Sequence, residues 1–228
     1  MIGTLFIVAT PIGNLDDITA RAHKTLGEAD FILAEDTRVC RKLAAHFGYK
    51  STIVRFDANA DQRTIQEVIG HLKAGKNLAL VTDAGTPAIS DPGSFLVSEV
   101  VLALRDEAKI IPIPGPSAVV AALSVSGFNA DTFTFFGFVP HKKGRAAKIN
   151  EIAETKYTAA LFESPHRILK TISELAAICP DRQAVVCREL TKMFETTYRG
   201  TLSDLAAPGK IREQGEFVIV LGPRNLSK

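Results

Sequence analysis

The sequence lacks several features that assign a protein to a class at once. Its three cysteines, Cys40, Cys179 and Cys187, show no CxxC spacing, so neither a disulfide framework nor a structural zinc site is indicated. No run approaches the roughly 18 apolar residues of a membrane span, and the apolar run near the N-terminus has no basic region before it. We therefore expect a cytoplasmic protein with no signal peptide, no bound metal and no membrane partner.

Common nucleotide-binding and hydrolase signatures are also missing. No GxGxxG follows the first apolar run, and GxxxxGK[ST], HExxH and GxSxG do not occur. These absences argue against a dinucleotide dehydrogenase, a P-loop NTPase, a zinc protease and a lipase. The net charge of +2 permits a nucleic-acid partner without implying one, because dedicated binders concentrate more Lys and Arg.

Strand-length apolar runs alternate with segments of helical period along the 228 residues. In the first half, strand candidates lie at residues 4–10, 30–35, 77–82 and 109–112. Residues 61–73 carry one apolar helical stripe, made of Ile65, Val68, Ile69 and Leu72. This rhythm predicts an α/β protein, with a mostly parallel sheet that has helices on both faces in its first domain.

The segment IPIPGPSA, residues 111–118, holds three prolines and a glycine. It cannot continue a helix or a central strand, so we place a domain boundary here. The predicted domains are residues 1–114 and residues 115–228. Strand candidates at 132–138, 158–162, 183–188 and 216–221, with helical patterns between them, predict a mixed α/β sheet for the second domain.

Three loops that follow predicted strands have unusual compositions. They are ATPIGN (9–14), DAGTPAISDPG (83–93) and PGPSA (114–118). Ligands of open parallel sheets collect at the carboxyl ends of the strands, and most βα loops run two to six residues, so the second loop favours a functional role. The first loop is equally compatible with an ordinary turn, and Ser117 of the third with a helix cap.

These loops belong to a series of motifs that occur in order between residues 3 and 222. They are VATPIGNLDDITARA, AEDTR, DAGTPAISDPG, PGPSAVVAALSVSG, GFVP, ESPHR and RELTK. In these motifs the chain resembles the ribosomal RNA small-subunit methyltransferase I family of the tetrapyrrole-methylase fold. The resemblance implies a homodimer that binds S-adenosylmethionine between its two domains. It also implies 2'-O-methylation of a cytidine ribose in 16S rRNA of the 30S subunit.

The resemblance also implies which residues contact the methyl donor. They are Pro11, Gly13, Ala84, Gly85, Thr86, Ile89, Ser117, Ala118, Phe162 and Leu190. The chain departs from the tetrapyrrole enzymes of this fold at the first loop, where they carry GxGPGD and this chain has ATPIGN. The departure favours the ribosomal branch.

Methyl transfer from a sulfonium needs alignment of the reactants and removal of the hydroxyl proton, so we expect a carboxylate near the methyl group. The candidates are Glu35, Asp36, Asp91 and Glu163. Glu35 is also compatible with a helix-capping or ion-paired role. The predicted catalytic set is Asp36, as first choice, together with Glu163 and Lys192, a cation that can hold phosphate.

The segment HKKGRAAK, residues 141–148, concentrates cations after GFVP. RNA backbone contact is one interpretation and a solvated helix start is the other. The predicted RNA-binding set is Arg38, Lys142, Lys143, Arg145 and Arg167. The aromatic run Phe135, Phe136 and Phe138 has strand spacing and is assigned to the core.

Two other functions remain open at this level. A small-molecule methylase that acts on a tetrapyrrole is the nearer one, although the GxGPGD loop is missing. A non-catalytic RNA-binding assembly factor on the same scaffold is the other, and it should tolerate loss of the donor loops, which are intact here.

Overall fold

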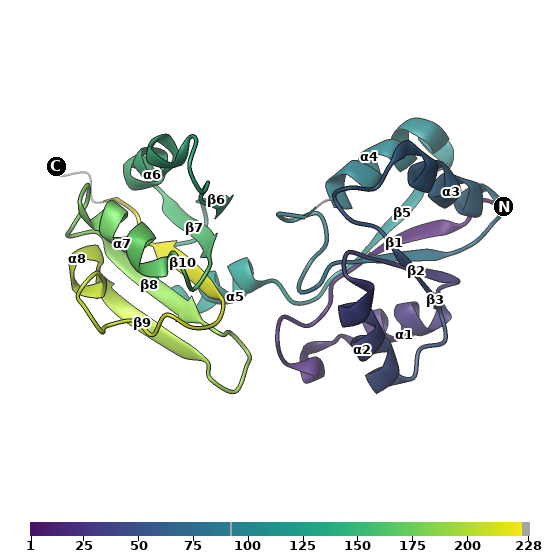
Figure 1. The fold of residues 1–228 in the computed structure, drawn as a ribbon. Coiled ribbons are helices and arrows are strands. Elements are labelled where there is room, and N and C mark those ends of the chain that lie inside the picture. Colours follow the sequence, from purple (N-terminus) through teal and green to yellow (C-terminus); the bar gives the residue numbers. More distant parts are fainter. Residues whose placement is uncertain (92, 225–228) are drawn as a thin grey trace. The chain divides into compact units, whose positions relative to one another are not determined.

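A computed structural model describes residues 1–91 and 93–224. The chain divides into two compact units, Met1–Ser117 and Ala118–Lys228 (Figure 1). No helix within the described ranges is long and apolar enough to cross a membrane.

The first unit is built on a parallel sheet with the strand order β3-β2-β4-β1-β5. Its strands are β1 (Thr4–Val8), β2 (Phe31–Ala34), β3 (Thr52–Arg55), β4 (Leu78–Val81) and β5 (Lys109–Ile113). Its helices are α1 (Ala20–Glu28), α2 (Thr37–Phe47), α3 (Gln62–Lys73) and α4 (Gly93–Leu104), with short 3-10 turns η1 (Leu15–Asp17) and η2 (Arg105–Glu107).

Helices cover both faces of this sheet, as predicted. Apolar side chains of α3 and α4, among them Ile65 and Leu96, form one buried cluster with Leu5 and Leu80. Side chains of α1 and α2 form a second cluster on the other face, where Leu26 packs with the sheet residues. The four residues of β4 are all buried because helices pack on both of its sides.

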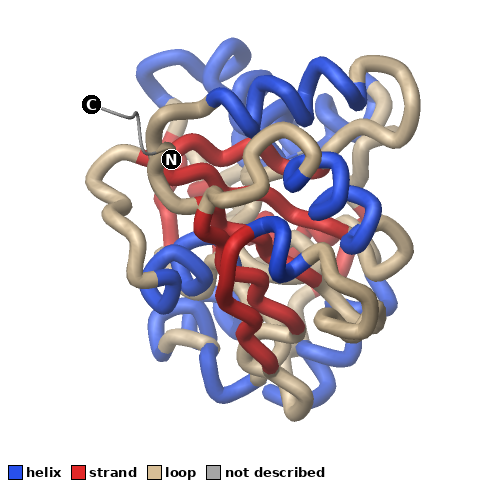
Figure 2. The backbone as a smooth tube through the Cα atoms, turned by 90° about the vertical axis from the view of Figure 1, so that its left-hand side faces the viewer, coloured by secondary structure: helices blue, strands red, loops and turns tan. Residues whose placement is uncertain are grey.

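The second unit contains a mixed sheet with the order β6-β7-β10-β8-β9. Its strands are β6 (Phe133–Phe138), β7 (Thr158–Glu163), β8 (Gln183–Arg188), β9 (Thr196–Thr201) and β10 (Phe217–Leu221). Its helices are α5 (Ala118–Ser126), α6 (Arg145–Glu154), α7 (Ile168–Ala176) and α8 (Leu202–Leu205). Figure 2 shows helices in blue lying along the strands in red. The two-sheet α/β architecture predicted from the sequence is confirmed.

The core assignment of Phe138 is wrong. This side chain is 54% exposed at the end of β6. Phe136 packs against the cluster beneath α6 and α7, and Phe135 against the cluster beneath α5. A shift in the pairing of β6 with β7 between Phe135 and Phe138 breaks the alternation that the sequence spacing assumed.

Asp61 is the N-cap of α3, and its Oδ1 accepts hydrogen bonds from Thr64 N at 2.8 Å and Thr64 Oγ1 at 2.9 Å. Asp61→Ala removes the cap and is expected to lower the free energy of unfolding by more than the loss of an uncapped surface acid does. Urea denaturation followed by circular dichroism measures the change. Glu67→Ala on the same helix removes an exposed acid that is not a cap, and it is expected to cost less than about 0.5 kcal/mol. Equal losses in the two variants would contradict the capping role.

Candidate functional site

The strand order of the first sheet defines where a ligand can approach it. From β1 the chain passes through α1 to β2 on one side, and from β4 it passes through α4 to β5 on the other. Helices α1 and α4 pack on opposite faces of the sheet, and the connections after the neighbouring strands β1 and β4 run in opposite directions. The position between β1 and β4 is therefore the topological switch point of the sheet. Ligands of open α/β sheets bind outside the carboxyl ends of the strands at such a point.

The three unusual loops meet at this switch point. Thr10 N donates to Gly85 O at 2.9 Å, and Gly85 N donates to Thr10 O at 3.1 Å. Thr86 Oγ1 donates to Pro116 O at 3.0 Å, which ties the second loop to the third. We call the described residues of the loops 9–14, 83–93 and 114–117 the three-loop assembly.

The loop 83–93 holds residues in an uncommon backbone conformation. Ala88 and Ser90 have φ angles of 71° and 66°, although neither is glycine. Asp91 Oδ1 fixes this conformation because it accepts hydrogen bonds from Ala88 N and Gly93 N, each at 2.8 Å. Such strain persists where the surroundings enforce it and clusters at binding sites.

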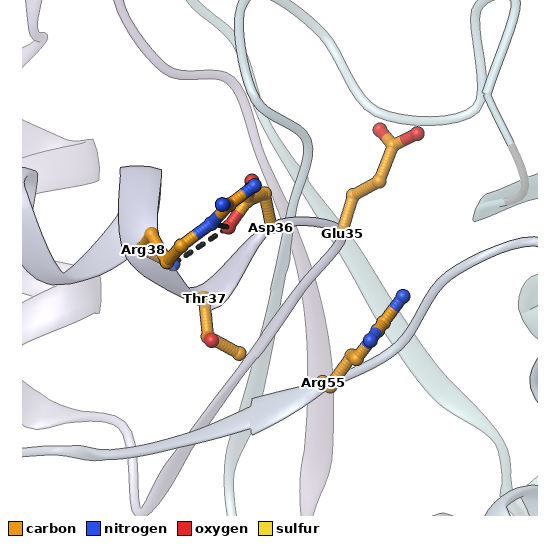
Figure 3. A pocket seen from close by; sticks show the side chains of 5 residues that line it. All are labelled: Glu35, Asp36, Thr37, Arg38 and Arg55. Atoms are coloured by element: carbon orange, nitrogen blue, oxygen red, sulfur yellow. Dashed lines mark hydrogen bonds and ion pairs between the residues drawn. The ribbon is translucent and has the colours of Figure 1, made fainter.

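Acidic and basic residues lie at the carboxyl ends of β2 and β3, on the same side of the sheet as the three-loop assembly. They line a pocket with a volume of about 240 Å³, formed by Glu35, Asp36, Thr37, Arg38 and Arg55 (Figure 3). Arg55 was missed in the sequence because it ends a strand that had not been predicted.

Asp36, the first choice for the catalytic carboxylate, is the N-cap of α2. Its Oδ1 accepts from Arg38 N at 2.8 Å, and its Oδ2 accepts from Arg38 Nη2 at 2.6 Å. The side-chain hydrogen bond from Arg38 lowers the pKa of Asp36 far below its usual range. A carboxylate held in this way is a weak proton acceptor.

Glu35 has a different environment. Its Oε2 accepts from Thr82 Oγ1 at 3.2 Å, and in Figure 3 its carboxylate points away from the Asp36–Arg38 pair. Burial raises the pKa of Glu35, the negative charge of Asp83 raises it further, and the Thr82 hydrogen bond only partly opposes them.

The second unit gathers its predicted contacts at one edge of its own sheet. Strands β6, β7 and β8 run in the same direction, so the motifs GFVP, ESPHR and RELTK follow their carboxyl ends together. Ala118, Phe162 and Leu190 are partly buried against the same apolar cluster, on the α5 face. The structure thus brings together three residues that the resemblance had grouped from separate motifs.

Glu163, predicted to be catalytic, lies buried at the end of β7. It pairs with Arg167 Nη2 at 2.8 Å and accepts from Thr171 Oγ1 at 2.6 Å. Arg167 also donates to Val139 O at 2.7 Å. These contacts give Glu163 and Arg167 a positioning role, because they join ESPHR to the end of GFVP.

Arg145 does not present its charge to solvent. It is 6% exposed, and its Nη2 lies 2.7 Å from Glu174 Oε2 and donates to Thr171 Oγ1 at 2.8 Å. The guanidinium groups of Arg145 and Arg167 are both ion-paired with glutamates of the second unit. We therefore do not assign either arginine as an RNA contact. Lys142 and Lys143 are exposed in the loop before α6.

Lys192, the third predicted catalytic residue, also has acidic partners. Its Nζ lies 3.0 Å from Glu189 Oε1 and 2.7 Å from Glu216 Oε2. The pair with Glu189 fixes the turn of RELTK, where Glu189 has a φ of 51°.

The parallel sheet, its switch point and the second mixed sheet define a class of proteins, the tetrapyrrole-methylase fold. A crystal structure of diphthine synthase has a TM-score of 0.74 at 17% identity and covers 96% of this chain and 90% of its own. The profile of the family described as Tetrapyrrole (Corrin/Porphyrin) Methylases matches residues 4–206.

Curated relatives are more similar in sequence. The protein named ribosomal RNA small subunit methyltransferase I of Halalkalibacterium halodurans is 44% identical, over 96% of this chain and 75% of its own length. The protein of the same name from Thermotoga maritima is 41% identical, over 96% of this chain and 98% of its own length. The chain belongs to the ribosomal RNA small subunit methyltransferase I family, within the tetrapyrrole methylases.

Proposed function

We propose that this protein transfers a methyl group from S-adenosylmethionine to the 2'-hydroxyl of a cytidine ribose in 16S rRNA of the 30S subunit. The enzyme works in the cytoplasm as a homodimer. The relatives named as small-subunit rRNA methyltransferases support an rRNA substrate. The three-loop assembly at the switch point of the first sheet is the observation that carries the proposal.

S-adenosylmethionine is the methyl donor, and the three-loop assembly fits it. Small residues such as Gly13 and Ala84 leave exposed backbone for the polar groups of a nucleoside and an amino acid. Ile89 presents an apolar side chain that is 48% exposed, as the flat face of a base requires. When bound, the donor supplies a methyl group activated by a sulfonium sulfur.

The remaining predicted donor contacts belong to the same proposal. In the first unit they are Pro11, Gly85, Thr86 and Ser117, and in the second unit they are Ala118, Phe162 and Leu190. Glu163 and Lys192 support this site by fixing the ESPHR and RELTK segments through their ion pairs. Asp36 holds Arg38 at the start of α2.

RNA is held by exposed cations in this proposal. Arg38 has a side chain that is 84% exposed although it pairs with Asp36, and Lys142 and Lys143 are exposed beside the second sheet. Cations on a surface bind the phosphate backbone without reading sequence. The choice of nucleotide then depends on the shape of the ribosomal subunit.

Transfer of radiolabelled methyl from S-adenosylmethionine to purified 30S subunits tests the proposal, with nuclease digestion and mass spectrometry of the product. We expect one 2'-O-methylated cytidine. If the protein binds the donor in calorimetry but labels no RNA, the rRNA substrate is wrong and tetrapyrroles are tested next. If it binds no donor, the enzyme assignment itself fails.

A further inference from the structure

The pocket at the ends of β2 and β3 differs in character from the three-loop assembly. Its volume of about 240 Å³ lies below the roughly 300–1,000 Å³ of pockets that enclose drug-sized ligands, so it suits a fragment the size of one sugar phosphate. Its lining combines carboxylates, which accept protons from hydroxyl groups, with guanidiniums, which bind phosphate.

We propose that this pocket binds the ribose and adjoining phosphate of the nucleotide that is methylated, with Glu35 as the proton acceptor and Arg55 as the phosphate ligand. The inference rests on the proposed function and adds two things to it, the pocket that binds the substrate nucleotide and the residue that accepts the hydroxyl proton. Neither residue belongs to the predicted catalytic or RNA-binding set.

The position of Glu35 favours this role. Glu35 follows β2, and its hydrogen bond from Thr82 joins it to the end of the neighbouring β4. Strand β1 lies next to β4, so about 10 Å, two strand spacings, separate the end of β2 from the end of β1. A nucleoside-sized ligand on the three-loop assembly spans that distance along the same edge of the sheet.

Other carboxylates at this edge already have partners that hold them. Both oxygens of Asp36 accept from Arg38, and Asp91 Oδ1 fixes two backbone amides. Asp57 accepts from Arg55 Nε at 2.7 Å. The contact of Glu35 within the described residues is the hydroxyl of Thr82, which can release it when a substrate hydroxyl arrives.

The charges around Glu35 prepare it to take a proton. Burial raises the pKa of its carboxyl, and the carboxylates of Asp83, Asp91 and Asp57 raise it further from the loops after β4 and β3. The other charged groups that line the pocket are Asp36, Arg38 and Arg55. A base with a raised pKa accepts a proton more readily in the transition state.

Arg55 is placed to hold a phosphate. Its side chain is 72% exposed, and in Figure 3 it extends from the end of β3 toward the side to which Glu35 points. Asp57 engages Nε and Nη2 of Arg55, which leaves Nη1 for a phosphate oxygen.

The transfer step balances with these residues. The 2'-hydroxyl oxygen bonds to the methyl carbon while the carbon–sulfur bond breaks and its electron pair stays on sulfur. The hydroxyl proton passes to the Glu35 carboxylate, which then loses it to water. No metal or covalent enzyme intermediate is needed for this balance.

Glu35→Gln in the full chain tests the role of Glu35 as the proton acceptor. We expect the rate of methyl transfer to 30S subunits to fall about 100-fold or more, while affinity for S-adenosylhomocysteine by calorimetry stays within about threefold. Glu28→Gln makes the same chemical change at an exposed acid of α1, with a side chain 67% exposed, and is expected to match wild type. Circular dichroism and thermal melting check that each variant is folded.

The pH profile separates a base from a structural acid. In wild type the rate is expected to rise with pH as Glu35 loses its proton, above the pH at which an ordinary glutamate titrates. Asp83→Asn removes a neighbouring negative charge, lowers the pKa of Glu35 and moves this rise to lower pH. A profile that does not move would overturn the assignment of Glu35.

Binding of 30S subunits without methyl donor tests Arg55. We expect Arg55→Gln to weaken binding and to reduce the slope of log affinity against log salt by about 0.7, as for one lost phosphate contact. Arg63→Gln, at an α3 side chain 86% exposed, should leave the slope unchanged. An unchanged slope in Arg55→Gln would remove Arg55 from the pocket's function.

The following outcomes separate a failure of the inference about this pocket from a failure of the proposed function. If wild type methylates 30S RNA and Glu35→Gln does so within threefold of it, the inference is wrong and the proposed function stands. If wild type methylates no RNA, the proposed function fails and the inference fails with it.

Discussion

Gly85→Arg is expected to abolish binding of S-adenosylmethionine, with at least about a 100-fold loss of affinity, or roughly 2.7 kcal/mol. Gly85 sits in the bridge with Thr10 at the centre of the three-loop assembly and has a φ of 87°. A Cβ here would lie 3.4 Å from Ile12 Cγ2 and 3.7 Å from Pro116 O, which are ordinary contacts. The space at Gly85 therefore admits a Cβ, at the cost of a strained positive φ, while the rest of the arginine side chain occupies space that the donor needs.

Gly48→Arg is the matched control for this variant. Gly48 also has a positive φ, 75°, but a Cβ there meets nothing within 4 Å. Both variants carry the strain of a side chain in the left-handed region, about 1–2 kcal/mol. Calorimetry with S-adenosylhomocysteine and thermal melts are expected to show similar stability in the two variants and donor binding only in Gly48→Arg. Normal affinity in Gly85→Arg would remove the loop 83–93 from the donor site.

Glu163→Gln is expected to lower the free energy of unfolding of the second unit by about 3–5 kcal/mol. The side chain of Glu163 is fully buried and that of Arg167 is 13% exposed, so the substitution leaves a cation without its counter-ion. The change also weakens the hydrogen bond from Thr171. Denaturation by urea, followed by circular dichroism, measures this loss.

The double variant Glu163→Gln with Arg167→Met separates a positioning role from a catalytic one. Removing both charges is expected to recover part of the lost stability, because no uncompensated charge remains buried. If Glu163→Gln instead keeps wild-type stability and loses only the rate of methyl transfer, Glu163 acts on the substrate and the positioning role is wrong.

The sequence predicted the strands inside the sheets and the edge strands β5 and β6, and it missed the two remaining edge strands, β3 and β9. Strands β1, β4 and β10 have apolar runs because other strands or helices cover them. Strand β3 is at the edge of its sheet, with no residue fully buried. Strand β9, with the sequence TTYRGT, is at the edge of the other sheet. Edge strands carry little of the apolar signal on which sequence prediction depends.

The loops of the candidate site could be located from the sequence, but the interaction partners of its charged side chains could not. Asp36 and Glu35 are neighbours with similar chemistry. Only the structure shows that Arg38 donates to Asp36 while Thr82 donates to Glu35. Arg145 belongs to a run of cations and yet pairs with Glu174 from a different helix. Long-range partners of this kind leave no trace in local spacing.

The bridge between Thr10 and Gly85 has a consequence for local opening. Each residue donates its amide hydrogen to the carbonyl of the other, so separating the two loops breaks both hydrogen bonds at once. Hydrogen exchange at the two amides therefore requires a single shared fluctuation. We therefore expect the loops after β1 and β4 to open together as one cooperative unit.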